Sequence, residues 1–278
     1  MTDHLTHLSL FSGIGGFEIA SGWAGFETIR QVEINEYCQK ILQKNFGDVP
    51  RSRDIKNVKG MELVEEVGQP ALITAGCPCQ PHSIAGCRKG SCDDRDLWPE
   101  TARCIDEIRP EWFLAENVSG ILSTENGQFF GGILRDLASM GYDVAWGSWE
   151  AAYVGAPHFR ERVFTLAHAN CNRCHGTHIP VRQRRQDETT PDSTRGNQGS
   201  SYTDLQRLQG HGEYGERTGE RTLREGAWET PWYDVAARVC RVDAGAANRV
   251  DRITALGNAV VPQQVYPLLQ AIAEVAIQ

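Results

Sequence analysis

The sequence predicts an α/β fold: a doubly wound, mostly parallel sheet with a second, smaller domain. Two observations support this prediction. Short apolar runs alternate with stretches of helical pattern through the first 168 residues, and the first run passes through a glycine turn into a helix. Several runs also end in an acid or a rigid turn, and open α/β sheets bind their ligands at the carboxyl ends of strands.

The composition favours a cytoplasmic protein. The nine cysteines are an odd count without a framework spacing, which favours free thiols over disulfides. The chain has no apolar run of about 18 residues, the length that would predict a membrane span. Its first residues also lack the basic and apolar regions of a secretory signal, so we expect none.

The net charge of −8 argues at first against a nucleic-acid partner, but the charge is unevenly distributed. Residues 1–150 hold 13 Lys and Arg against 22 Asp and Glu, whereas residues 151–278 hold 15 against 14. Between Arg160 and Arg185 the chain has six arginines and one acid. A local cationic face of this kind suits contact with phosphates.

The first strand is predicted over Leu8–Phe11, and the glycine turn 12–16 leads from it into a helix. Glycines let the backbone approach a ligand, and the N–H groups of the helix start point toward it. The third glycine comes too early for a dinucleotide fingerprint. An ordinary tight turn is the alternative interpretation.

Two acids follow the next predicted strands. Glu33 follows the strand Thr28–Val32, and an acid at this place commonly holds the hydroxyls of a ribose. The alternative for Glu33 is a solvated surface acid. Asp54, followed by Ile55, ends a third short segment and can accept a hydrogen bond from an adenine amino group. Together they outline a site for a ribose-adenine ligand.

The central stretch is a buried strand, Ala71–Ala75, that breaks into a turn with two prolines. This turn presents the thiol of Cys79 at the carboxyl end of the strand, and we interpret Cys79 as a nucleophile. A buried or metal-binding cysteine is the alternative, since Cys77 lies close by.

The loop 80–96 that follows has glycines near both ends and is interpreted as a mobile lid. The spacing of its two cysteines, 87 and 92, fits no common zinc finger.

An acidic side chain is also expected next to Cys79. A helix over Leu97–Ile108 precedes a strand over Trp112–Ala115, and Glu116 follows that strand in the sequence Glu-Asn-Val. The carboxyl ends of parallel strands meet at one edge of the sheet, so this carboxylate should lie near the thiol.

Six motifs, in this order along the chain, resemble those of the DNA (cytosine-5) methyltransferases, in a short form like those carried by phages and prophages. They are FSGIGG at 11–16, GCPCQPHS at 76–83, ENV at 116–118, the helix-then-strand unit 127–146, YVGAPHFRERVF at 153–164 and LGNAVVP at 256–262. The resemblance covers residues 8–168 and about 249–278 and implies the S-adenosylmethionine-dependent methyltransferase fold.

The resemblance also implies a reaction and its residues. A methyl group would pass from S-adenosylmethionine to C5 of cytosine in double-stranded DNA, through a covalent adduct between Cys79 and C6 of a flipped-out base. Glu116 would hold or protonate N3 and should therefore have a raised pKa. Arg162 would contact the base oxygen, and Arg160 the adjacent phosphate or the acid. The cofactor residues implied are Phe11, Gly13, Gly15, Glu33, Ile34, Asp54, Ile55, Pro78, Leu97 and Asn258.

The composition changes at about residue 170. The catalytic and cofactor-binding domain is assigned to residues 1–168 and 254–278, with a closing helix from Pro262 to about Ile277, and a small target-recognition domain to 169–253. Residues 170–228 contain nine arginines and no lysine, which suits bidentate contacts to guanines and phosphates. The alternative is an insert that is disordered without DNA. A CxxC pair formed by Cys171 and Cys174 lacks a second pair, so no metal is predicted.

Two segments depart from the family pattern. His158 stands where glutamine is usual, and a histidine can titrate. The segment Trp232–Arg249 also differs from the usual penultimate motif, which puts efficiency and specificity in doubt. Three rival functions stay open: cytosine-5 methylation of tRNA, a catalytically silent DNA-binding relative, and a zinc-dependent binding module. We expect a monomer that acts on DNA beside a separate cognate restriction endonuclease.

Overall fold

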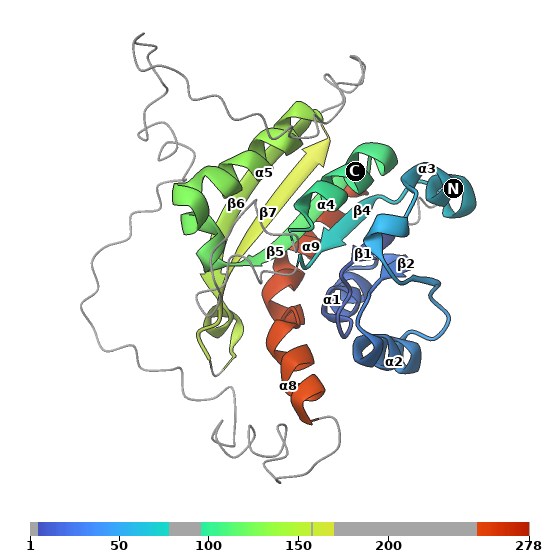
Figure 1. Ribbon diagram of the computed structural model, residues 1–278, viewed down its shortest axis with the longest axis horizontal. Coiled ribbons are helices and arrows are strands. Elements are labelled where there is room, and N and C mark those ends of the chain that lie inside the picture. Colours follow the sequence, from blue (N-terminus) through green and yellow to red (C-terminus); the bar gives the residue numbers. More distant parts are fainter. Residues whose placement is uncertain (1–4, 78–95, 157, 170–248, 278) are drawn as a thin grey trace, which may run out of the picture. The chain divides into compact units, whose positions relative to one another are not determined.

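The computed structural model describes residues 5–77, 96–156, 158–169 and 249–277 (Figure 1). The described strands form a seven-stranded sheet in the order β3-β2-β1-β4-β5-β7-β6. Among these strands, β7 alone runs in the direction opposite to the other six, which confirms the predicted α/β fold with a mostly parallel sheet. The strands are β1 Thr6–Leu10, β2 Glu27–Val32, β3 Arg51–Ser52, β4 Leu72–Ala75, β5 Trp112–Val118, β6 Tyr142–Glu150 and β7 Glu161–Ala169.

Helices pack on both faces of the sheet, so the residues that the structure describes form two apolar cores. One core lies between the sheet and α3, α4 and α5, and the other between the sheet, α1 and α9 (Figure 1). The helices are α1 Gly16–Trp23, α2 Glu36–Asn45, α3 Gly60–Val67, α4 Trp98–Ile108, α5 Gln128–Ser139, α8 Arg249–Asn258 and α9 Pro262–Ala276.

The central strands β4 and β5 are mostly apolar because they are covered on both sides. In β4, Ile73 belongs to the core under α3–α5, whereas its neighbour Leu72 belongs to the core under α1 and α9. Phe113 and Leu114 divide in the same way in β5. This burial on both faces confirms the buried strand predicted over 71–75. The turn that follows β4 begins at the carboxyl edge of the sheet.

A buried histidine joins three neighbouring strands. Nδ1 of His7 in β1 lies 3.0 Å from Oγ1 of Thr28 in β2, and its Nε2 lies 2.7 Å from Oγ1 of Thr74 in β4. The side chain is fully buried, and this burial lowers its pKa to about 3. The imidazole is therefore neutral at physiological pH.

Two features differ from the sequence prediction. The strand predicted over 112–115 continues to Val118, because β7 supplies an antiparallel partner along its whole length. Glu116 therefore lies within a strand instead of after one. Helix α8 is not predicted from the sequence, since its composition is polar and a glycine, Gly257, lies next to its end.

No helix in the described ranges is both long and apolar enough to cross a membrane. Several sequence predictions lie outside the described residues. They are Pro78 and Cys79, the lid up to residue 95 with its two cysteines, the pair Cys171 and Cys174, and the recognition region from 170 to 248.

Candidate active site

A cavity of about 420 Å³ lies at the carboxyl ends of the parallel strands. Because β7 runs antiparallel to β5, its first residues reach the same edge of the sheet. The cavity therefore collects the segments that follow β1, β2, β3 and β4, the end of β5, the start of β7 and the end of α8. Eleven of the predicted site residues line it: Phe11, Gly13, Glu33, Ile34, Asp54, Ile55, Leu97, Glu116, Arg160, Arg162 and Asn258.

The glycine turn and Glu33 form one wall of the cavity. Gly13 adopts a φ of +57°, which favours glycine, and its N–H donates to Oε2 of Glu33 at 2.7 Å. The N–H of Asn35 donates to Oε1 at 2.7 Å. Two main-chain donors thus fix the carboxylate, which is 8% exposed, at the rim of the pocket. Each oxygen keeps a further lone pair for a ligand hydroxyl.

The segment after β3 forms the next part of the wall. Oδ1 of Asp54 accepts a hydrogen bond from the N–H of Lys56 and caps the 3₁₀ helix Ile55–Asn57. Ile55 is buried, whereas Ile34 is 60% exposed where it lines the cavity. This wall offers one acceptor beside apolar surface, a combination that suits a purine ring.

A buried acid–arginine pair lies in the same cavity. Glu116 is 6% exposed, and Nε of Arg162 lies 2.8 Å from its Oε1. Burial raises the pKa of Glu116, and the charges of Arg162 and Arg160 offset only part of this effect. The upward direction confirms the prediction that the pKa of Glu116 is raised.

The side chain of Arg160 donates its hydrogen bonds to the protein's own main chain. Its Nη1 donates to the carbonyl oxygen of Gly257 at 2.7 Å, and its Nη2 donates to that of Ala259 at 2.6 Å. The guanidinium is near enough to Glu116 to act on it electrostatically, but its hydrogen bonds go to the end of α8. Sequence spacing cannot reveal these partners because they lie almost 100 residues further along the chain.

Gly15 is not among the residues that line the cavity. It has a φ of +96°, and a Cβ at this position would come 2.4 Å from Cε2 of Phe46. This glycine therefore serves the packing of the turn against the end of α2. The prediction that Gly15 packs around a cofactor is not reflected in the lining of the cavity.

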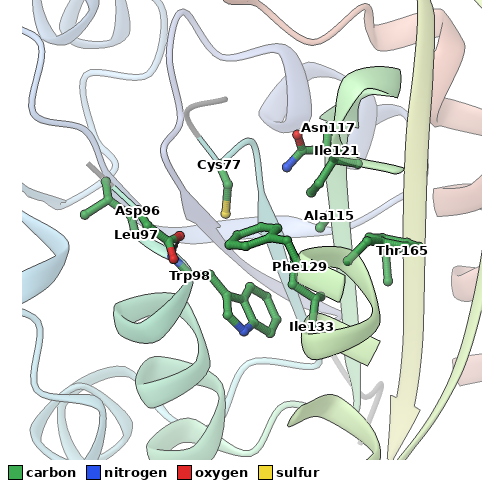
Figure 2. Close-up of a pocket in the computed structure, with 11 residues that line it drawn as sticks. Cys77, Asp96, Leu97, Trp98, Ala115, Asn117, Ile121, Phe129, Ile133 and Thr165 are labelled. Atoms are coloured by element: carbon green, nitrogen blue, oxygen red, sulfur yellow. Dashed lines mark hydrogen bonds between the residues drawn. The ribbon is translucent and has the colours of Figure 1, made fainter. Parts of the chain in front are cut away.

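Cys77 faces a second, smaller pocket of about 30 Å³. Figure 2 shows its thiol and the ring of Phe129 turned toward the same space. Sγ of Cys77 lies 3.6 Å from Oγ1 of Thr101, and burial raises the pKa of the thiol to about 12. Cys77 is therefore almost entirely protonated at neutral pH and is a poor nucleophile.

Some lining residues are not predicted from the sequence. Cys38, Arg53 and Thr254 line the large cavity, and Asn117 and Thr165 line the small one. Arg53 directly precedes a predicted site residue, Asp54, and this adjacency is the one signal in the sequence that points to any of them. The others depend on how α2, α8 and β7 approach the edge of the sheet.

The family model described as C-5 cytosine-specific DNA methylase matches residues 5–227. Among curated relatives, Type II methyltransferase M.FnuDI of Fusobacterium nucleatum is 37% identical over 158 residues, which are 56% of this chain and 45% of that protein. Type II methyltransferase M.HhaI of Haemophilus parahaemolyticus is 30% identical over 167 residues, 60% of this chain and 50% of that protein. The chain thus spans about half the length of these relatives.

Two solved structures share the fold. A prophage-encoded protein of E. coli assigned as a DNA modification methyltransferase is 27% identical, with a TM-score of 0.52 over 59% of this chain and 47% of that chain. A DNMT2 variant from Spodoptera frugiperda is 22% identical, with a TM-score of 0.51 over 69% of this chain and 56% of that chain. The second likeness shows the fold alone.

Proposed function

The chain belongs to the C-5 cytosine-specific DNA methylase family, and we propose that it transfers a methyl group from S-adenosylmethionine to C5 of cytosine in double-stranded DNA. One observation carries the proposal. A buried acid with a raised pKa, Glu116, is paired with Arg162 inside a cavity that also contains the fixed carboxylate of Glu33. Proton donation and nucleoside binding can therefore occur within one site.

The residues present fit S-adenosylmethionine. Glu33 would accept hydrogen bonds from the ribose hydroxyls, Asp54 would accept one from the adenine amino group, and Ile55 and Leu97 would pack against the ligand. Gly13, at positive φ, lets the backbone follow the cavity without a side chain. When bound, the cofactor supplies an electrophilic methyl group. Phe11, Ile34, Pro78 and Asn258 complete the proposed set.

The base-side chemistry needs a nucleophile and an acid. We assign the nucleophile to Cys79, which lies outside the described residues. Its thiolate adds to C6, the C5–C6 double bond opens, and N3 takes the proton that Glu116 holds. C5 would then carry the electron pair that takes up the methyl group, and the cofactor's sulfur would leave as a neutral thioether. Loss of the C5 proton to a base would restore the double bond, expel the thiolate and let the N3 proton return to Glu116.

Arg162 has two tasks in this scheme. Its positive charge lies beside Glu116 and keeps the carboxyl group oriented toward the base. It would also donate to the carbonyl oxygen of cytosine, where negative charge develops when the thiolate adds. Burial of Glu116 raises its pKa, which favours a carboxyl group that can share a proton with the base.

A duplex substrate requires base flipping, because C6 cannot be reached inside the stack, and unpairing costs a few kcal/mol. We assign target recognition to residues 169–253 and the catalytic domain to residues 1–168 and 254–278. A cognate endonuclease, a monomeric state and a cytoplasmic location stay predictions from the sequence.

The experiment that tests this function is transfer of labelled methyl groups from S-adenosylmethionine to mixed-sequence duplex DNA and, in parallel, to tRNA. Label at C5 of cytosine in DNA is the expected result. Label on tRNA alone would replace the DNA substrate by RNA. No label on either, despite bound cofactor, would favour a catalytically silent DNA-binding relative.

A further inference from the structure

The segment 257–261, which joins α8 to α9 and is called the junction below, lies against several parts of the cavity. Gly257 and Asn258 line the cavity. A Cβ on Gly16, the first residue of α1, would come 2.4 Å from the carbonyl oxygen of Val260, so this oxygen lies directly over the turn. The place of the junction therefore affects the cofactor side of the cavity.

Arg160 contacts this junction through its guanidinium group. Its two terminal nitrogens donate to the carbonyl oxygens of Gly257 and Ala259, at 2.7 and 2.6 Å. The last carbonyl groups of a helix have no partner within it, and cations near them are favourable. The guanidinium thus takes the place of a C-terminal cap for α8, whose last turn contains no basic residue.

The backbone of Arg160 is fixed by the same region. Nε2 of Gln264, which is 1% exposed, donates to the carbonyl oxygens of Trp149 at 2.8 Å and of Arg160 at 3.2 Å. Arg160 has a φ of +31°, an unfavourable value for a residue with a side chain. Surrounding contacts must maintain such a conformation, which places a constraint on where the guanidinium lies.

Two residues further along the chain, Arg162 pairs with Glu116. We propose that Arg160 is a positioning residue that couples the junction on the cofactor side to the Arg162–Glu116 pair on the base side. The inference rests on the proposed function, because it takes S-adenosylmethionine as the ligand of the cavity. In this role Arg160 binds carbonyl groups of the protein's own backbone instead of a DNA phosphate. The cofactor site, which the junction borders, and the orientation of the Glu116 carboxyl group would then both depend on the side chain of Arg160.

The two roles of Arg160 predict different results in the absence of DNA. A residue that only contacts phosphate has no effect on the free protein's affinity for S-adenosylmethionine. A positioning residue does, because releasing the junction disturbs the cavity wall. We therefore expect Arg160→Met to weaken S-adenosylmethionine binding about tenfold by calorimetry without DNA. Arg160→Lys should recover part of this loss, since one ammonium group keeps the charge but cannot span both carbonyls as a fork does.

Arg135→Met is the control. It removes the same charge from an exposed arginine of α5 that lines neither cavity, so cofactor affinity should stay within about twofold, the spread expected when no contact is lost. Unchanged affinity in both Arg160 variants would overturn the inference. So would equal weakening in Arg135→Met, because the effect would then come from net charge alone.

Hydrogen exchange gives a second readout that needs no ligand. In Arg160→Met, amides of segment 254–264 should exchange about tenfold faster than in the wild type, while those of α5 keep their rate. Unchanged exchange in 254–264 would contradict the inference, and faster exchange everywhere would show general unfolding and contradict it too. A wild type that binds no S-adenosylmethionine would refute the proposed cofactor but leave this readout intact.

Discussion

Nε of Arg162 lies 2.8 Å from Oε1 of Glu116, diagonally across the antiparallel strands β5 and β7, where Glu116 faces Phe164 and Arg162 faces Val118. This cross-strand relationship explains how one carboxyl group can be buried and yet oriented. Burial favours its protonated form, and the arginine limits that effect. The pair is thus suited to exchange a proton with a base.

Replacing Glu116 should slow methyl transfer without weakening the binding of S-adenosylmethionine. Glu116→Gln keeps the shape of the side chain but removes its titratable proton. We expect the single-turnover rate of methyl transfer to fall about 10²- to 10⁴-fold, the contribution usual for a general acid. Affinity for S-adenosylmethionine should change little. A rate within a few fold of the wild type would exclude Glu116 as the proton donor.

Glu33→Gln should weaken both stability and cofactor binding. The carboxylate accepts main-chain hydrogen bonds from Gly13 and Asn35, whereas an amide must turn its NH₂ group toward one of these donors. We expect a loss of about 1–3 kcal/mol in the free energy of unfolding and a clear loss of S-adenosylmethionine affinity. Glu36→Gln is the control, because its ion pair with Arg53 is exposed and should contribute less than about 1 kcal/mol.

Two glycines of α1 should respond in opposite ways to alanine. Gly16→Ala forces a Cβ toward the carbonyl oxygen of Val260, so the α8–α9 junction must move and the variant should lose about 1–3 kcal/mol. Gly22→Ala meets nothing within 4 Å, and it should gain about 0.4–1 kcal/mol by reducing the entropy of the unfolded chain. Urea denaturation measures both. Equal effects would show that the junction does not lie over Gly16.

The buried histidine predicts how stability depends on acid. The pKa of His7 is about 3 in the folded protein and about 6.5 when unfolded, so the unfolded chain binds the proton first as pH falls. Stability should be fully present above about pH 6.5 and decline toward pH 3, by as much as about 5 kcal/mol from this group. His7→Gln should be less stable at pH 7 and show a flatter decline. An unchanged slope would contradict the assignment to His7.

Much of the scaffold can be predicted from local sequence. An apolar run such as that of β4 can be recognised because a strand covered on both faces needs apolar side chains on both of them. The positions of Glu33 and Glu116 follow from the rule that ligands meet the carboxyl ends of parallel strands.

The rest depends on contacts between distant segments. The extension of β5 to Val118 requires β7, which begins more than 40 residues later. The partners of Arg160 lie in the α8–α9 junction, and the reason for Gly15 is the ring of Phe46. Such pairings have no periodicity or spacing in the sequence, so they become visible only once the sheet and the C-terminal helices are placed.

The covalent step is the central claim, and trapping its adduct tests it most directly. Duplex DNA of mixed sequence containing 5-fluorocytosine would be incubated with the protein and S-adenosylmethionine, since fluorine at C5 blocks the final proton loss. Peptide mapping should find the base on Cys79, with the same adduct in Cys77→Ser and none in Cys79→Ser. An adduct on Cys77, or no adduct from protein that binds both DNA and cofactor, would contradict the proposed mechanism.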